Sequence, residues 1–315
     1  MALPTKLALV FPGQGSQAVG MGRDLYESFP AAREVLDAAN AVLGFDLSRL
    51  MFEGPGEELV RTVNAQPALL AGSVAALRVL ESEGIRADFA AGHSVGEYAA
   101  LVAAGSIEFA EAVRLVRRRG ELMDEAAAVR PGTMAAIIGL AADEVRAAVG
   151  LAQSAGIVDV ANYNSPGQVV VSGEPAAVEE ACRIAKERGA KRTMPLRVSG
   201  AFHSRLMAPA AEAMRLELER ARISDPALPV VANVTADYVR TADEVRSALA
   251  RQIVGSVRWE ESIIRIAEDG AEGFVEVGHG TVLAGLIART LRDAQVRSVG
   301  DRSSVEALLL ERAQG

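Results

Sequence analysis

Gly92, Ser94 and Gly96 form a Gly-x-Ser-x-Gly pattern, which is typical of a nucleophilic serine on a sharp turn between a strand and a helix. Glycine is needed at both positions because such a turn leaves no room for β-carbons beside the serine. Residues 87–91 are a short, mostly apolar run that predicts a buried strand, and residues 96–104 have a helical pattern. The sequence therefore predicts Ser94 as a nucleophile.

A serine nucleophile needs a base that takes its proton, and the chain contains three histidines. His93 is a poor candidate, because the side chains of adjacent residues on a sharp turn point apart. His279 stands between two glycines, where a structural or surface role is the stronger interpretation. His203 follows an apolar run where a small domain would return to a larger one, so we predict it as the base, facing a cleft between them. No Asp or Glu has a position that nominates it as the partner of this imidazole, so a carbonyl oxygen is open for that role.

Two donors are expected to stabilise the oxyanion that forms when a serine attacks an acyl group. One is the main-chain N–H of Val95, directly after the nucleophile. The other is expected from Gln14, in a glycine-rich loop that follows a predicted strand at residues 6–11. This loop also matches Gly-x-Gly-x-x-Gly/Ala, but the acidic residues about 20 positions later lie in a helical pattern and not at the end of a second strand. We therefore favour an oxyanion donor over a dinucleotide site.

A predicted helix over residues 108–126 contains Arg114, Arg117, Arg118 and Arg119. A solvated basic face is the simplest interpretation of this cluster. These four side chains cannot all point the same way around a helix, so one of them could face inward.

Strands alternate with helices along most of the chain, which predicts an α/β fold with a mostly parallel sheet covered on both faces. Residues 133–198 differ, because their pattern is βαββαβ, the ferredoxin-like order. We therefore predict a large domain over residues 1–128 and 199–315, with an inserted small domain over residues 129–198. Within the large domain, the pair Gln66-Pro67 predicts the start of a helix over residues 67–83.

The composition excludes several classes of protein. A net charge of −8 over 315 residues gives no reason to expect nucleic acid as a partner. The single cysteine, Cys182, excludes an internal disulfide and is expected to be a buried structural thiol in a helix. The first apolar run is too short for a signal peptide, and no run approaches about 18 apolar residues, so we expect a cytoplasmic protein without a membrane span.

Several motifs together resemble the malonyl-CoA:acyl carrier protein transacylases of bacterial fatty-acid synthesis and, more distantly, the acyltransferase domains of polyketide synthases. The matches cover the whole chain in the order of that family. They are residues 11–17 (FPGQGSQ), 66–68 (QPA), 92–97 (GHSVGE), 119–120 (RG), 162–168 (NYNSPGQ), 201–204 (AFHS), Gln252 and 276–278 (EVG).

The resemblance implies a catalytic arrangement for these residues. Ser94 would be the acyl nucleophile and His203 its base, with the backbone carbonyl of Gln252 orienting the imidazole. Gln14 and the N–H of Val95 would form the oxyanion hole. The implied fold is a large domain similar to the α/β-hydrolase sandwich with the ferredoxin-like insert.

The resemblance also implies a substrate site. Arg119 would bind the free carboxylate of the malonyl group, which suits a planar guanidinium because it can donate two charge-assisted hydrogen bonds. Gln66 would be a polar lining residue nearby, and Asn162 a further substrate-binding residue. The Ala-Phe-His-Ser sequence at His203 favours malonyl over methylmalonyl groups. No metal and no redox cofactor is implied.

The implied partners are malonyl-CoA and the phosphopantetheine arm of acyl carrier protein. Carrier proteins are typically acidic, so docking is expected to use a local basic patch. Lys191 and Arg192, near Lys186 and Arg188, are our hypothesis for it, and a solvated face is the alternative. We expect a monomer, in fatty-acid rather than polyketide synthesis.

Two other functions stay open at this point. A serine thioesterase or other hydrolase would use the same Ser94 and His203, but would have no reason to keep Arg119 in its pocket. A non-catalytic module that binds carrier protein would not need these residues intact. One departure from the family pattern is His279, which stands where proline is usual after Glu-Val-Gly and outside the chemical set.

Overall fold

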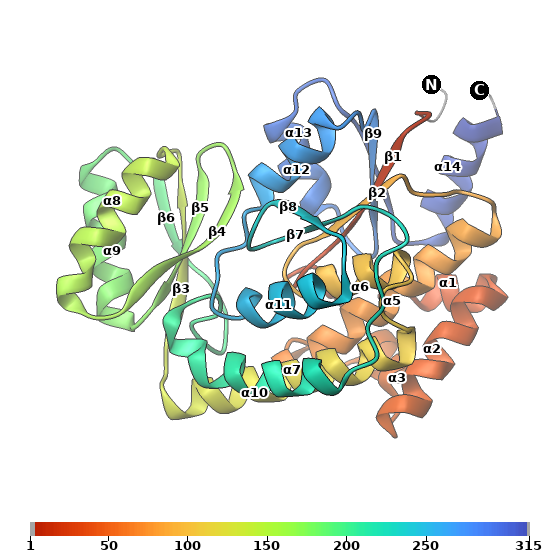
Figure 1. Ribbon diagram of the computed structural model, residues 1–315, viewed down its shortest axis with the longest axis horizontal. Helices are drawn as coiled ribbons and strands as arrows, with labels where there is room; N and C mark the ends of the chain where they lie inside the picture. Colours follow the sequence, from red (N-terminus) through yellow and green to blue (C-terminus); the bar gives the residue numbers. More distant parts are fainter. Residues whose placement is uncertain (1–3, 314–315) are drawn as a thin grey trace.

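The computed structural model describes residues 4–313, and its largest feature is a six-stranded sheet (Figure 1). The strands are β1 (Leu7–Phe11), β2 (Phe89–Gly92), β7 (Val230–Ala232), β8 (Asp237–Val239), β9 (Gly273–Val277) and β10 (Gln295–Val299). Their order is β10-β9-β1-β2-β7-β8, and all neighbours pair parallel except β7 and β8, which pair antiparallel. The mostly parallel sheet predicted from the sequence is confirmed.

Helices precede and follow these strands along the chain. They are α1 (Arg23–Ser28), α2 (Pro30–Leu43), α3 (Leu47–Glu53), α4 (Gly56–Leu59), α5 (Thr62–Ser82), α6 (Gly96–Ala103), α7 (Phe109–Val129), α10 (Ala208–Arg220), α11 (Ala242–Gln252), α12 (Trp259–Glu268), α13 (Val282–Thr290) and α14 (Arg302–Ala313). A short 3₁₀ turn, Arg205–Met207, precedes α10.

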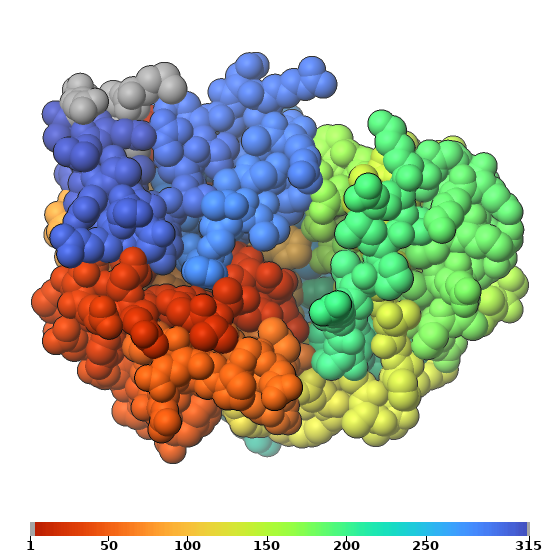
Figure 2. Space-filling view, turned by 180° about the vertical axis from the view of Figure 1, so that it is seen from behind, coloured from red at the N-terminus to blue at the C-terminus, as the bar shows by residue number. Residues whose placement is uncertain are grey.

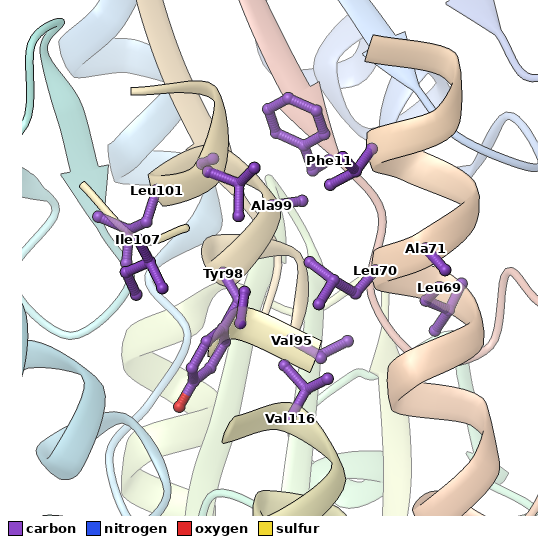
Figure 3. Packing of buried hydrophobic residues seen from close by; sticks show 14 of the residues in the cluster. Phe11, Leu69, Leu70, Ala71, Val95, Tyr98, Ala99, Leu101, Ile107 and Val116 are labelled. Carbon is purple, nitrogen blue, oxygen red and sulfur yellow. The ribbon is translucent and has the colours of Figure 1, made fainter. Parts of the chain in front are cut away.

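Both faces of the large sheet are buried, as expected for parallel strands. Alternate residues of β1 belong to different cores: Leu9 and Phe11 pack with α5 and α6, whereas Ala8 and Val10 pack with α12 and α13. Figure 3 shows Val95, at the start of α6, between the side chains of α5 and α7. The turn that holds Ser94 is therefore anchored in the main hydrophobic core.

A second sheet of four antiparallel strands stands beside the first (Figure 1). Its strands are β3 (Thr133–Ile138), β4 (Val158–Ser165), β5 (Gln168–Gly173) and β6 (Arg192–Pro195), and its helices are α8 (Ala142–Ala152) and α9 (Pro175–Glu187). The spatial order β4-β5-β3-β6 is that of a ferredoxin-like βαββαβ unit, which confirms the predicted fold class. We call these six elements the small unit.

The predicted start of a helix at Pro67 is wrong. Helix α5 begins at Thr62, so Pro67 lies inside it. A proline there cannot donate to the carbonyl of Val63, one turn earlier. Nη1 of Arg117, on α7, donates to that carbonyl at 3.1 Å, so a contact from another helix replaces the missing hydrogen bond.

Helix α5 is also long and apolar enough to cross a membrane by length and composition, although 89% of its most apolar window is buried inside the protein. It is a core helix of this fold. Charged and polar residues interrupt its apolar run, which is why the run length alone did not single it out.

Several short elements were not predicted, namely α1, α3 and β8. They span only three to seven residues, too few to show a clear period. Residues 56–64 form α4 followed by the start of α5, and the last strand of the small unit, β6, has only four residues. Cys182 is half-buried in α9 rather than fully buried, and burial still raises the pKa of its thiol.

Candidate active site

Ser94 lies on the turn between β2 and α6, with its backbone in the left-handed region at φ 53°. The neighbouring glycines are sterically required. A β-carbon on Gly92 would overlap with the main chain of Gly96, and one on Gly96 would overlap with the carbonyl group of Phe11 in β1. The structure thus has the strand, turn and helix that the Gly-x-Ser-x-Gly pattern predicts.

The hydroxyl of Ser94 meets the imidazole of His203, with Oγ and Nε2 2.8 Å apart. On the other side of the ring, Nδ1 faces the carbonyl oxygens of Gln252 at 2.8 Å and Gly255 at 3.2 Å. Carbonyl oxygens only accept, so Nδ1 has the proton and Nε2 is free to accept one from the serine. The structure therefore brings together the three residues that the resemblance combined.

His203 is 4% exposed, and its surroundings keep the ring neutral. Burial, followed by the positive charge of Arg119, lowers the pKa of His203 to about 3, against smaller opposing effects of its carbonyl partners. A neutral imidazole is the form that can take a proton from Ser94.

Arg119 is the arginine of α7 that faces inward, with only 1% of its surface exposed. Its Nη1 donates to Oε1 of Gln66 at 2.8 Å, and its Nη2 donates to Oε1 of Gln252 at 2.9 Å and to Oγ of Ser94 at 3.2 Å. Nε has no partner among the described residues. Within residues 4–313 no carboxylate forms an ion pair with this guanidinium, so a buried cation stands beside the nucleophile with neutral partners only.

The other three arginines of α7 are exposed or half-buried, and all pair with glutamates. Arg114 pairs with Glu111, Arg117 with Glu121, and Arg118 with acidic residues of α7 and α10. The choice between a solvated face and an inward residue, which the sequence left open, is resolved as one buried arginine, Arg119, and three that reach the surface.

A cavity of about 800 Å³ opens at Ser94 between the large sheet and the small unit. Figure 2 shows the surface hollowed between the blue and red segments on one side and the green segment on the other. The predicted site residues that line this cavity are Gln14, Ser94, Val95, Arg119, Asn162 and His203. Asn162 comes from β4, so the small unit supplies part of the wall.

Gln66 and Gln252 are placed differently from the other predicted residues. Neither has any exposed surface and neither lines the cavity. The expectation that Gln66 is a lining residue is wrong: its amide lies behind Arg119 and holds the guanidinium. Its position inside α5, rather than at a helix start, is what directs it into the core.

Two polar groups near Ser94 were missed by sequence reasoning. Oδ1 of Asn233 accepts from the main-chain N–H of Ser94 at 2.7 Å, and Glu97 accepts from Asn233 and Gln252. A usable signal existed for Asn233, because it directly follows β7, and the carboxyl ends of parallel strands share one edge of the sheet.

The two docking candidates, Lys191 and Arg192, are exposed at the start of β6 and do not line the cavity. Nearby Arg188 pairs with Glu144, which offsets its charge. His93 is not at the site of proton transfer, since its Nε2 donates to Oδ1 of Asn164 at 2.9 Å. His279 does not line the cavity either.

The α/β sheet, the serine on its strand-to-helix turn and the histidine on the serine hydroxyl are consistent with an acyltransferase. The acyl transferase domain family matches residues 8–308 of the chain.

The chain belongs to the malonyl-CoA:acyl carrier protein transacylase family within this class. It is 46% identical over 303 residues to the malonyl CoA-acyl carrier protein transacylase of Bacillus subtilis (strain 168), covering 96% of each chain. It is 45% identical over 306 residues to that of Escherichia coli (strain K12), covering 97% of this chain and 99% of the other.

Solved structures agree with this assignment. An acyl carrier protein S-malonyltransferase from Vibrio cholerae matches with a TM-score of 0.94 at 43% identity, over 96% of this chain and 100% of its own. A malonyl-transacylase in complex with a type II PKS acyl-carrier protein matches with a TM-score of 0.94 at 44% identity, over 97% of this chain and 99% of its own.

Proposed function

We propose that this protein transfers a malonyl group from malonyl-CoA to the phosphopantetheine thiol of acyl carrier protein through a malonyl-Ser94 intermediate. The observation that supports this most directly is Arg119, a buried cation 3.2 Å from the nucleophile with only neutral partners. Such a group is suited to bind the free carboxylate of an acyl chain attached to Ser94.

In the first half-reaction, Oγ of Ser94 attacks the thioester carbonyl and Nε2 of His203 takes the hydroxyl proton. Gln14 and the N–H of Val95 stabilise the oxyanion of the tetrahedral intermediate; Val95 directly precedes α6, where main-chain N–H groups lack helical partners. The C–S bond then breaks, and the CoA sulfur leaves with the proton from His203.

The second half-reaction reverses these roles. His203 takes the proton of the phosphopantetheine thiol, and the thiolate attacks the ester carbonyl of malonyl-Ser94. The C–O bond breaks, and Ser94 recovers its proton from the imidazolium. The kinetics are then ping-pong, with one covalent intermediate.

Arg119 gives selectivity for an acyl group with a terminal carboxylate. Gln66 holds the guanidinium, and Asn162 lines the cavity from β4. An acetyl group leaves the buried cation without an anionic partner. We expect Arg119→Ala to lower kcat/KM for malonyl-CoA by about 100-fold or more, because charged hydrogen bonds in a buried site contribute about 1.5–3 kcal/mol each.

The test is the intact mass after brief mixing with malonyl-CoA, with acetyl-CoA in parallel, on the wild type and on Ser94→Ala. One malonyl adduct on the wild type only, with little acetyl adduct, is the expected result. Release of CoA without any adduct would favour a thioesterase, and absence of both adduct and turnover would favour a non-catalytic binding module.

We further propose a cytoplasmic location, a monomeric state and a role in fatty-acid synthesis. The lone cysteine and the burial of α5 agree with the first of these. A role in polyketide synthesis is the second candidate, because one similar structure is a malonyl-transacylase bound to a type II PKS acyl-carrier protein. Transfer rates to carrier proteins of the two kinds would separate them.

A further inference from the structure

Glu97 is a buried carboxyl group directly after the Gly-x-Ser-x-Gly pattern, 1% exposed, and the mechanism above does not use it. It does not line the cavity. One of its oxygens, Oε2, accepts two hydrogen bonds, from the main-chain N–H of Asn233 at 2.9 Å and from Nε2 of Gln252 at 2.7 Å.

The two donors bonded to Glu97 hold the nucleophile. Oδ1 of Asn233 accepts from the main-chain N–H of Ser94 at 2.7 Å, and its Nδ2 donates to the carbonyl of Gly92 at 2.6 Å. Nε2 of Gln252 also donates to the carbonyl of Ser94 at 3.0 Å. Both main-chain polar groups of Ser94 are therefore held by residues that Glu97 anchors.

Gln252 connects Glu97 to two further groups at the site. Its side-chain Oε1 accepts from Nη2 of Arg119 at 2.9 Å, and its main-chain carbonyl accepts from Nδ1 of His203 at 2.8 Å. With Nε2 donating to Glu97, only Oε1 can face the guanidinium. Arg119 thus has an acceptor that fixes its position without cancelling its charge.

We propose that Glu97 is a positioning residue: through the amide of Gln252 it sets Arg119 for the malonyl carboxylate, and through Gln252 and Asn233 it sets Ser94 and His203 for acyl transfer. This inference rests on the proposed function. A direct Glu97–Arg119 ion pair would compete with the substrate carboxylate, whereas the interposed amide transmits position and leaves the cation available.

The two hydrogen bonds need an acceptor at the Oε2 position, and on this proposal they do not need a negative charge there. Both donors to Glu97 are uncharged N–H groups, and burial raises the pKa of Glu97 to about 7 against the opposing effects of its hydrogen bonds and of the charge of Arg119. A glutamine can place its carbonyl oxygen at the same point and keep both hydrogen bonds.

Glu97→Gln and Glu97→Met form the matched pair of variants, because methionine has a similar size and no comparable acceptor. We expect Glu97→Gln to keep the malonyl-CoA kinetics within about 5-fold. We expect Glu97→Met to lower kcat for both malonyl-CoA and acetyl-CoA about 10- to 100-fold, since it leaves buried donors unpaired. For malonyl-CoA alone, KM should also rise, because Arg119 loses its fixed acceptor.

The split between kcat and KM separates positioning from a loss of folded protein, which would lower the active fraction and leave KM and the malonyl-to-acetyl ratio unchanged. The double variant Glu97→Met/Gln252→Met gives a second readout: its malonyl-to-acetyl ratio should be close to that of Gln252→Met alone, because the path from Glu97 to Arg119 through the amide is already broken. All rates are taken per folded enzyme, from the thermal unfolding amplitude.

The inference is overturned if Glu97→Met keeps the malonyl-to-acetyl ratio and KM of the wild type, or if the Glu97→Met and Gln252→Met effects on the malonyl-to-acetyl ratio multiply independently. It is also overturned if Glu97→Gln is as impaired as Glu97→Met, since that would show a need for charge. If the wild type forms no malonyl-enzyme, the proposed function fails instead, and that result is distinct from any of these.

Discussion

His203 is a base whose strength depends on a neighbouring cation. Burial is the largest cause of its lowered pKa, and the charge of Arg119 is the next. When a malonyl carboxylate binds Arg119, its negative charge offsets that of the guanidinium. We expect the pKa of His203 then to rise toward the working pH, which would improve proton transfer. In this site we expect the bound malonyl carboxylate to strengthen the base that takes the proton of Ser94.

Arg119→Ala should therefore raise the pKa of His203 in the free enzyme. A base acts only when deprotonated, so kcat/KM falls as the pH drops through its pKa. In the pH profile of the Ser94 acylation rate, we expect the fall on the acid side to lie at higher pH in Arg119→Ala than in the wild type. Acetyl-CoA is the substrate to use, since it has no carboxylate to interact with residue 119.

The matched control is Arg118→Ala, one residue earlier on α7, where the side chain pairs with Glu121 and faces outward. Its fall on the acid side should coincide with that of the wild type. An unchanged fall on the acid side in Arg119→Ala would show that the guanidinium does not influence the base.

Gly96 shows how little space surrounds the nucleophile. Gly96→Ala would place a β-carbon on the carbonyl group of Phe11 in the central strand, where only main-chain movement could relieve the overlap. We expect a loss of about 3 kcal/mol or more in the free energy of unfolding, measured by urea denaturation.

A contrasting glycine serves as the control for this substitution. Gly150 lies inside α8, and a β-carbon there would meet no heavy atom within 4 Å. Gly150→Ala should stabilise the protein by about 0.5–1 kcal/mol, because alanine favours helix. Equal effects at the two glycines would contradict the steric account of the serine turn.

At the scale of elements, the pairing of α5 with α7 supports the site from behind. Gln66 on α5 accepts a hydrogen bond from Arg119 on α7. The two helices can approach closely because Gly120 has no β-carbon, which would lie only 2.9 Å from Cα of Val63. Pro67 breaks the hydrogen bonding of α5 next to Gln66, and Arg117 repairs it from α7.

We expect Arg117→Met to lower the free energy of unfolding by about 1 kcal/mol through loss of the hydrogen bond to Val63. In a Pro67→Ala background the cost should be smaller, because the substituted alanine has an N–H that can donate to the same carbonyl. Arg114→Met, which removes only an exposed pair with Glu111, should change stability by less than about 0.5 kcal/mol. Equal costs of Arg117→Met in both backgrounds would refute this account.

At the scale of the whole molecule, the small unit has its own sheet and its own apolar core. We propose that residues 129–198 are a domain inserted into a larger one formed by residues 1–128 and 199–315. The two parts also touch by main chain, since Val257 donates to Ala161 at 2.8 Å and accepts from Tyr163 at 2.9 Å. This contact lies close to Gln252 and Gly255, so it helps to hold the carbonyls that face His203.

The small unit also contains our docking hypothesis. Lys191→Glu/Arg192→Glu should slow transfer from malonyl-Ser94 to acyl carrier protein by about 10-fold or more at low salt, and leave serine acylation by malonyl-CoA unchanged. Arg183→Glu, on α9 and paired with Glu180 and Glu187, is the control for charge reversal on this unit. Equal rates of transfer for all three proteins would exclude a docking role.

The parts of this molecule that followed from the sequence are those fixed by local patterns. The serine turn could be predicted because its steric limits demand glycine at both Gly92 and Gly96. The βαββαβ order could be predicted because the period of the apolar residues changes within residues 133–198. The start of α5 could not be predicted, because a tertiary hydrogen bond from Arg117 removes the penalty that a proline imposes on a helix.

The supporting residues of the site were equally hidden from local patterns. Glu97 has no short-range feature that shows its link to Gln252, 155 positions away in the chain. Gln66 looked like a helix-start residue with a polar side chain, and only the packing of α5 against α7 places it behind Arg119.

The central position of β1 has a consequence for synthesis on the ribosome. Its partner β2 ends at Gly92, but its other partner, β9, begins only at Gly273. Translation proceeds at about 5–20 residues per second, so β9 is synthesised roughly 10–50 s after β1. Throughout that time the nascent chain lacks the native partner of one edge of β1, and unpaired strand edges make incomplete chains prone to aggregation. Nascent chains arrested before residue 273 should therefore resist protease far less than chains arrested after the last strand.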